Sequence, residues 1–115
     1  MIAVIFEVTP TEEGKQEYLE IAACLREYLI KMPGFISIER FQSLAEPEKL
    51  LSLSFWENED SITKWRNLEV HRNAQSKGRN QLFKEYRIRV CNVARDYTLT
   101  ARNEAPSDSN DLYSK

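Results

Sequence analysis

The residues best suited to chemistry lie between positions 56 and 86. If residues 59–77 form one helix, five of them recur at steps of three and four and are expected to share a face: Ile62, Trp65, Leu68, His71 and Gln75. This pattern places the only histidine and a tryptophan on the side that faces the rest of the fold. A histidine lining a pocket can move a proton near neutral pH. The alternative is a partly buried histidine bonded to a backbone carbonyl or a glutamate, with Trp65 as ordinary core.

Other side chains in the region could bind a substrate. Tyr86 offers a second polar tip from the last predicted strand, and Trp56 ends an earlier one. Arg72 and Arg79 could attract an anion, although solubility is the commoner use of such residues.

Several kinds of chemistry are disfavoured. One histidine cannot form a histidine cluster for a metal, and Gly14, Gly34 and Gly78 lie too far apart for a phosphate-binding loop. There is no G-x-S-x-G motif. Cys24 and Cys91 have no CxxC partner, so we expect two reduced thiols. The sequence therefore disfavours a metalloenzyme, a nucleotide-binding protein and a hydrolase.

The first half of the chain predicts a strand, a helix and a hairpin. Residues 2–8 are β-branched and aromatic, which predicts a strand. A helix to about Met32 follows, capped by Thr9 with Pro10 at its first position, or by Thr11. Pro33-Gly34 ends it, and residues 35–43 and 49–56 pair around a turn at 45–48.

The second half predicts a helical region, a long strand and a tail. Residues 58–78 form one helix, or two short helices broken near Asn67. A strand from Phe83 to Leu99 exceeds the usual length, so we expect a bulge or bend near Asn92. Residues 1–100 then form one domain. The polar composition of residues 101–115 predicts a disordered tail.

The order βαββαβ predicts an α+β, ferredoxin-like fold, with a four-stranded antiparallel sheet and both helices on one face. Three strands are apolar on both sides, although a sheet face exposed to water should be polar. One example has Leu51, Leu53 and Phe55 opposite Leu50 and Trp56. We therefore expect two copies to pack these second faces together in a homodimer.

Composition bounds the partners and the location. The 115 residues suit one domain, and the net charge of −2 argues against a dedicated nucleic-acid binder. No apolar run approaches the length of a membrane span, and no basic-then-apolar leader opens the chain. These features predict a soluble, cytoplasmic protein.

Four segments together resemble the antibiotic biosynthesis monooxygenase (ABM) family, which belongs to the dimeric α+β-barrel superfamily. The segments are Phe35-Ile-Ser-Ile-Glu-Arg-Phe-Gln, Leu51-Ser-Leu-Ser-Phe-Trp56, the stretch from Trp65 through His71-Arg-Asn-Ala-Gln to Arg79, and Tyr86. The resemblance covers residues 1 to about 100. It implies a dimeric barrel and, in some relatives, oxidation of a small aromatic, quinol-like substrate by O₂ without a metal or a flavin.

The resemblance suggests site residues and leaves two classes open. Trp65 and His71 are the candidate catalytic residues, and the candidate substrate-binding residues are Trp56, Tyr86, Arg72 and Gln75. No cofactor or metal is implied. Haem-degrading relatives fit less well, because no asparagine precedes Asn58 and Gln75 stands where their histidine is expected. The alternative to an oxygenase is a non-catalytic dimeric binding or stress module of the same fold.

Overall fold

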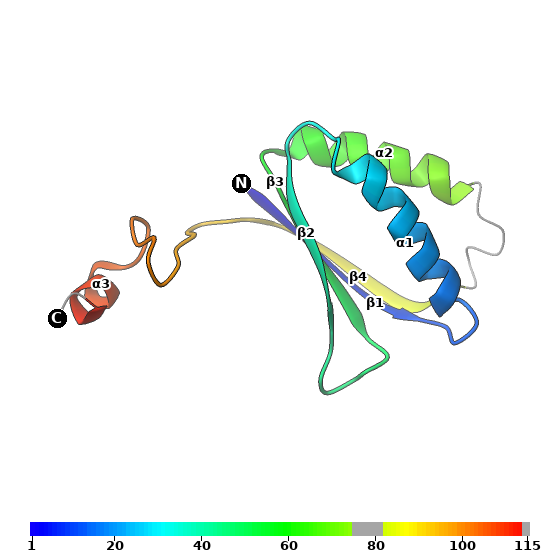
Figure 1. Ribbon diagram of the computed structural model, residues 1–115, viewed down its shortest axis with the longest axis horizontal. Coiled ribbons are helices and arrows are strands. Elements are labelled where there is room, and N and C mark those ends of the chain that lie inside the picture. The colour runs from blue at the N-terminus through cyan, green and yellow to red at the C-terminus, as the bar shows by residue number, and fades with distance from the viewer. Residues whose placement is uncertain (75–81, 114–115) are drawn as a thin grey trace.

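The computed structural model describes residues 1–74 and 82–113, with the side chains of residues 1–67 and 82–111. The elements run β1 (Ile2–Pro10), α1 (Lys15–Leu29), β2 (Phe35–Gln42), β3 (Leu50–Trp56), α2 (Glu59–Ala74), β4 (Phe83–Asn92) and α3 (Ser107–Tyr113). The strands form one antiparallel sheet in the order β2-β3-β1-β4. Figure 1 shows α1 and α2 on the same side of this sheet, which confirms the predicted ferredoxin-like fold.

The start of α1 corrects the prediction that Thr9 caps this helix. Thr9 and Pro10 remain in β1, where they pair with β4, and the Thr11 backbone N–H donates to the Leu82 carbonyl at 2.8 Å. The helix therefore begins only at Lys15, after a turn in which Thr11 Oγ1 accepts from the Gly14 N–H at 2.8 Å. A Cβ at Gly14 would lie 2.5 Å from the Leu82 Cα, so the approach of this turn to β4 requires glycine.

The other boundaries follow local signals. Gly34 has a φ of +82°, which lets the chain turn from α1 into β2. Asn58 Oδ1 accepts from the Ser61 N–H and caps α2, which runs unbroken past Asn67 to Ala74. The predicted hairpin of β2 and β3 is confirmed.

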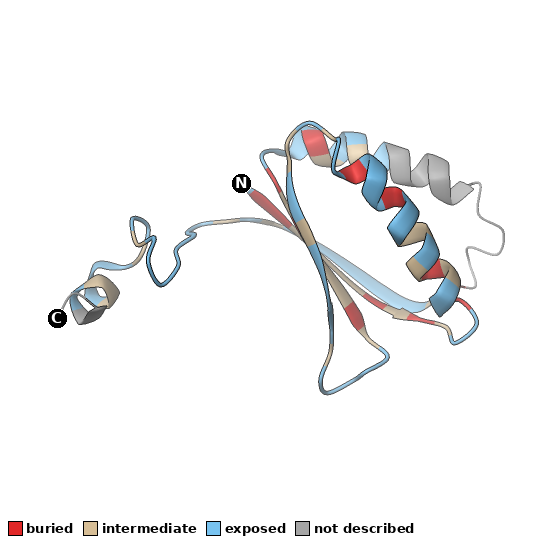
Figure 2. Ribbon diagram, in the orientation of Figure 1, coloured by how far each residue is buried: buried red, intermediate tan, exposed pale blue. Residues whose placement is uncertain are grey.

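The last strand is shorter than predicted. β4 ends at Asn92, where its partner strand β1 begins at Ile2, so beyond this point there is no neighbouring strand to pair with. Figure 1 shows the following segment leading away from the sheet to α3, and most of its residues are exposed (Figure 2). The described helix α3 lies within the region whose composition predicts disorder.

The core between helices and sheet is divided into two clusters. One gathers around Ile2, Leu29 and Trp56, and the other around Val8, Tyr18 and Leu50. Ile2 and Val8 are six residues apart on β1, so the clusters lie about 20 Å apart along the sheet. The helix layer is thus fixed at both ends of the sheet, and the space between the clusters holds the candidate site.

Candidate functional site

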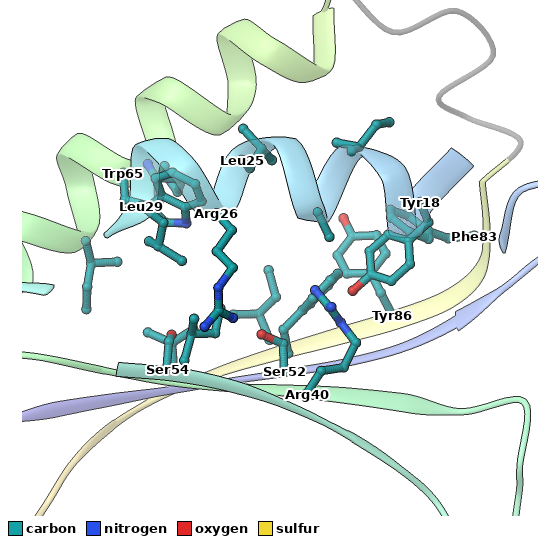
Figure 3. Close-up of a pocket in the computed structure, with 18 of the residues that line it drawn as sticks. Tyr18, Leu25, Arg26, Leu29, Arg40, Ser52, Ser54, Trp65, Phe83 and Tyr86 are labelled. Carbon is teal, nitrogen blue, oxygen red and sulfur yellow. The ribbon is translucent and has the colours of Figure 1, made fainter. Parts of the chain in front are cut away.

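A cavity of about 1060 Å³ lies between the two core clusters. Its floor is the inner face of the sheet and its roof is formed by α1 and the first turns of α2 (Figure 3). The walls are mainly apolar and include Val4 and Phe6 of β1, Leu25 of α1 and Ile88 of β4. Most binding sites for small organic molecules have this character, an apolar hollow with a few polar groups.

Aromatic side chains line both ends of the cavity. At one end the rings of Trp56 and Trp65 lie 6.4 Å apart at 33°. At the other end Phe83 makes an edge-on contact with Tyr18 at 5.5 Å and lies 6.0 Å from the ring of Tyr86. The site therefore offers flat apolar surfaces at both ends, which suits a planar or ring-containing ligand.

The hollow follows from the size of the residues on the inner face of β3. Leu50 and Trp56 at the strand ends are large and buried, whereas the two inner positions between them are Ser52 and Ser54. Above them, α1 contributes the small Ala22 to the lining. Large residues at the ends support the helix, and small ones in the middle leave space below it.

One of these serines has a structural partner. The Trp56 Nε1–H donates to Ser54 Oγ at 2.9 Å, and both residues are buried. This bond satisfies the indole N–H and fixes the orientation of the tryptophan ring at the end of the cavity.

Two arginines, both exposed, bring positive charge to the border of the cavity near its middle. Arg26 points down from α1 toward Ser54, and Arg40 rises from β2 beside Ser52 (Figure 3). The Arg40 Cζ lies 5.5 Å from the centre of the Tyr18 ring, a cation–π contact that holds this side chain in place. Arg26 borders the cavity from the helix side and Arg40 from the sheet side.

The cavity contains three of the six predicted site residues. Trp56, Trp65 and Tyr86 all belong to its lining. His71 and Arg72 lie on α2, but their side chains are outside the described ones, and Gln75 lies outside the described residues altogether, as does Arg79. The roles assigned to these six residues stay predictions.

The sequence reasoning missed the polar residues in the middle of the cavity. They are Arg26, Arg40, Ser52 and Ser54. A signal was present, because a serine at every second position of an otherwise apolar strand marks one face as different. An arginine at the centre of the inner face of β2 was a second such signal.

Two further findings concern metals and membranes. Among the described side chains, those of residues 1–67 and 82–111, no three of His, Cys, Asp or Glu are placed to hold a metal ion together. None of the helices in the same part of the chain is long and apolar enough to cross a membrane.

The fold and the cavity define a small α+β protein with a ligand-sized hollow between sheet and helices, and comparison with known proteins supplies the family. The family model "Antibiotic biosynthesis monooxygenase" matches residues 1–77. The chain belongs to this family.

Two relatives are similar over most of the chain. It is 44% identical over 93 residues to a Pyricularia oryzae protein named jasmonate monooxygenase ABM, covering 81% of this chain and 43% of that protein. It is 32% identical over 94 residues to YqjZ of Bacillus subtilis, covering 81% and 79%. The chain therefore spans less than half the length of the fungal relative.

Solved structures share the fold at low identity. Rv0793 from Mycobacterium tuberculosis has a TM-score of 0.72 at 13% identity, over 84% of this chain and 98% of that one. SnoaB from Streptomyces nogalater, a cofactor-independent oxygenase, has a TM-score of 0.66 at 11% identity, over 83% and 94%. At such identities the likeness concerns the fold alone.

Proposed function

We propose that the chain is a monooxygenase that oxidises a small aromatic, quinol-like substrate with O₂ and uses neither a metal nor a flavin. The observation that carries the proposal is the apolar cavity with Trp56, Trp65 and Tyr86 in its wall, in a chain of the ABM family. A filled core would have favoured a non-catalytic module, so the cavity supports the enzyme. We also propose that it acts as a cytoplasmic homodimer.

The chemistry balances without a further reductant for an anthrone-type substrate. Its CH₂ group becomes a carbonyl, which releases four electrons and two protons. One oxygen atom of O₂ enters the product, and the other takes up the two protons and leaves as water. The substrate thus supplies every electron that O₂ accepts, after deprotonation has made it electron-rich.

The protein's part is to bind the substrate and to deprotonate it. The aromatic ends of the cavity hold the rings of the substrate, and its apolar walls pack against the rest of it. His71 is the proposed proton acceptor, and Trp65 orients the substrate against it. Trp56, Tyr86, Arg72 and Gln75 are the proposed binding residues. Arg26 and Arg40 favour the anionic form of the substrate by their charge.

Oxygen uptake against a panel of anthrones, quinols and catechols tests the proposal. We expect one O₂ consumed for each quinone formed, with no peroxide released. His71→Ala should lower turnover about 10²-fold or more, because it removes the proton acceptor. Lys64→Ala, on the exposed side of the same helix, is the control and should leave turnover unchanged. Absence of uptake with the whole panel would contradict the proposal.

A second candidate substrate is jasmonate. It is favoured by the 44% identity with the Pyricularia oryzae protein that carries this name. Insertion of one oxygen atom into a C–H bond consumes two electrons that the substrate does not supply. Oxygen uptake with jasmonate should therefore depend on an added reductant such as NADPH, whereas uptake with anthrones should not. This dependence separates the two candidates.

A further inference from the structure

The middle of the cavity combines apolar walls with unusual charge. The inner positions of β1 are Ile2, Val4, Phe6 and Val8, and those of β3 are two serines between Leu50 and Trp56. Arg40 on β2 stands next to this surface, at the position paired with Ser52. Arg26 faces it from the helix above (Figure 3).

Within the described side chains, neither arginine forms an ion pair with a carboxylate. The ion pairs among the described side chains join Glu7 to Lys49 and to Arg89, on the outer face of the sheet. Charged residues at the border of the cavity comprise the cations Arg26, Arg40, Arg66 and Lys84 and the carboxylates Glu39 and Glu85. The balance in the described lining is positive, although the chain as a whole carries −2.

Two guanidinium groups on opposite walls suit a carboxylate. Each presents N–H donors in a fixed plane, and an anion between them gains charge-assisted hydrogen bonds that a neutral group cannot make. The Ser52 hydroxyl lies beside Arg40 and can add a neutral donor. From here the aromatic ends of the cavity extend in both directions along the sheet.

We propose that Arg26 and Arg40 bind the carboxylate of an apolar, ring-containing acid, whose body lies along the aromatic walls of the cavity. This rests on the proposed function, since it names the substrate class for the same cavity, and it applies to an aromatic acid and to jasmonate alike. The charged head fixes the position and direction of the substrate, and the body supplies most of the buried area.

Paired probes isolate the contribution of the carboxylate. Anthracene-2-carboxylate and its methyl ester share an aromatic body, and jasmonate and methyl jasmonate share a cyclopentanone body. Affinities are measured with the full chain by calorimetry. Tryptophan fluorescence reports binding in the cavity, because both tryptophans of the chain line it. We expect each acid to bind about tenfold or more tightly than its ester.

Substitutions then assign the effect to the two arginines. Arg26→Gln and Arg40→Gln should each weaken binding of the acids about tenfold and leave the esters within about twofold. Arg40→Lys should restore part of the loss, because it keeps the charge but not the planar donor pair. Arg95→Gln, an exposed residue after β4, removes the same charge outside the cavity and should change nothing.

The outcomes separate this inference from the proposed function. Equal affinity for acid and ester, or an equal loss of both in the arginine variants, overturns the carboxylate site. If oxygen uptake with uncharged phenols then persists, the proposed function stands alone. If no acid and no ester binds, the carboxylate site falls, and the oxygen-uptake panel decides the proposed function separately.

Discussion

The two faces of β3 have the reverse of the polarity that is usual in a two-layer domain. A sheet covered on one side is usually apolar toward the helices and polar toward water. Here the covered face carries Ser52 and Ser54 at its centre, whereas the open face carries Leu51, Leu53 and Phe55. The small serines on the covered face therefore leave space below the helices. The apolar residues on the open face indicate that this face packs against another surface.

The outer face has the composition of an interface. Leu53 pairs with Ile5 of β1, and Phe55 pairs with Ala3, so the apolar side chains are contiguous across the two central strands. Glu7 marks one end of the patch, where its carboxylate lies 3.4 Å from Arg89 and 3.8 Å from Lys49. A second copy of the same face is the occupant that we propose.

The largest effect is expected from a charge at the centre of this face. Leu53→Glu would bury an unpaired carboxylate between the two sheets, which costs several kcal/mol. We expect the protein to change from a dimer of about twice 13.5 kDa to a monomer, as measured by light scattering at micromolar concentration.

A matched substitution outside the patch is the control for this effect. Leu44 in the turn of the hairpin is fully exposed, and Leu44→Glu should leave the dimer intact. A wild-type protein that is a stable monomer at the same concentration would contradict the proposed interface.

The next effect concerns the ends of the inner face, where the core is filled. Leu29 is 2% exposed and packs with Ile2 and Trp56. Leu29→Ala should lower the free energy of unfolding by about 2–5 kcal/mol, measured by urea denaturation, because it leaves a void in a packed cluster. Ile30→Ala, at the adjacent exposed position, should change it by no more than about 0.5 kcal/mol. Similar losses at both positions would contradict the assignment of the core.

A substitution in the middle of the inner face should affect ligand binding more than the free energy of unfolding. Ser52→Leu adds apolar volume where the structure has space, so the free energy of unfolding should change by no more than about 1 kcal/mol. Ligand binding should weaken about tenfold or more, since the new side chain occupies the cavity beside Arg40. Loss of stability with unchanged binding would mean that this region is packed core.

Much of the fold could be predicted because its signals are local. Asn58 caps α2, Pro33-Gly34 ends α1, and alternation in β1 and β3 identifies the two faces. The predictions that were wrong depended on distant partners. Pro10 stays in β1 because β4 pairs with it, and β4 ends at Asn92 because β1 begins opposite it.

The site could be predicted only in part. Trp65 was predicted from the spacing of its helix, and Trp56 and Tyr86 from strand aromatics within the resemblance to the ABM family; all three line the cavity. The stripe that led to His71 uses three successive steps of three residues, and nine residues make about two and a half turns. Position 71 thus lies about half a turn from Ile62 on an ideal helix, and spacing alone does not place it at the cavity.

The cavity itself could not be predicted, because it depends on how side-chain sizes on three elements match. Small residues in β3 leave a space only if the helix above them is held away by large residues at both ends. The residues that set this spacing between helix and sheet come from β1, α1 and β3, so no local sequence pattern predicts it.

The smallest effect is expected from changes in the tail, which lies away from both faces of the sheet. Arg102 donates to Ser109 Oγ at 2.6 Å and to Asn110 Oδ1 at 3.1 Å, and its guanidinium lies 5.0 Å from the centre of the Tyr97 ring. These contacts join residues within 97–110 to one another, and Figure 1 shows α3 away from the sheet and the long helices.

Truncation after Ala101 tests whether the tail is independent of the domain. It removes α3 and Arg102 but keeps the bond from the Val93 N–H to the Met1 carbonyl at 3.1 Å, which closes the end of the sheet. We expect the melting temperature to fall by no more than about 2 °C and the ligand affinity to stay unchanged. Arg102→Ala in the full chain is the milder companion variant and should expose the tail to proteases without changing the domain. A fall of many degrees, or a weaker dimer, would instead mean that the tail packs on the partner subunit and belongs to the interface formed by the outer face.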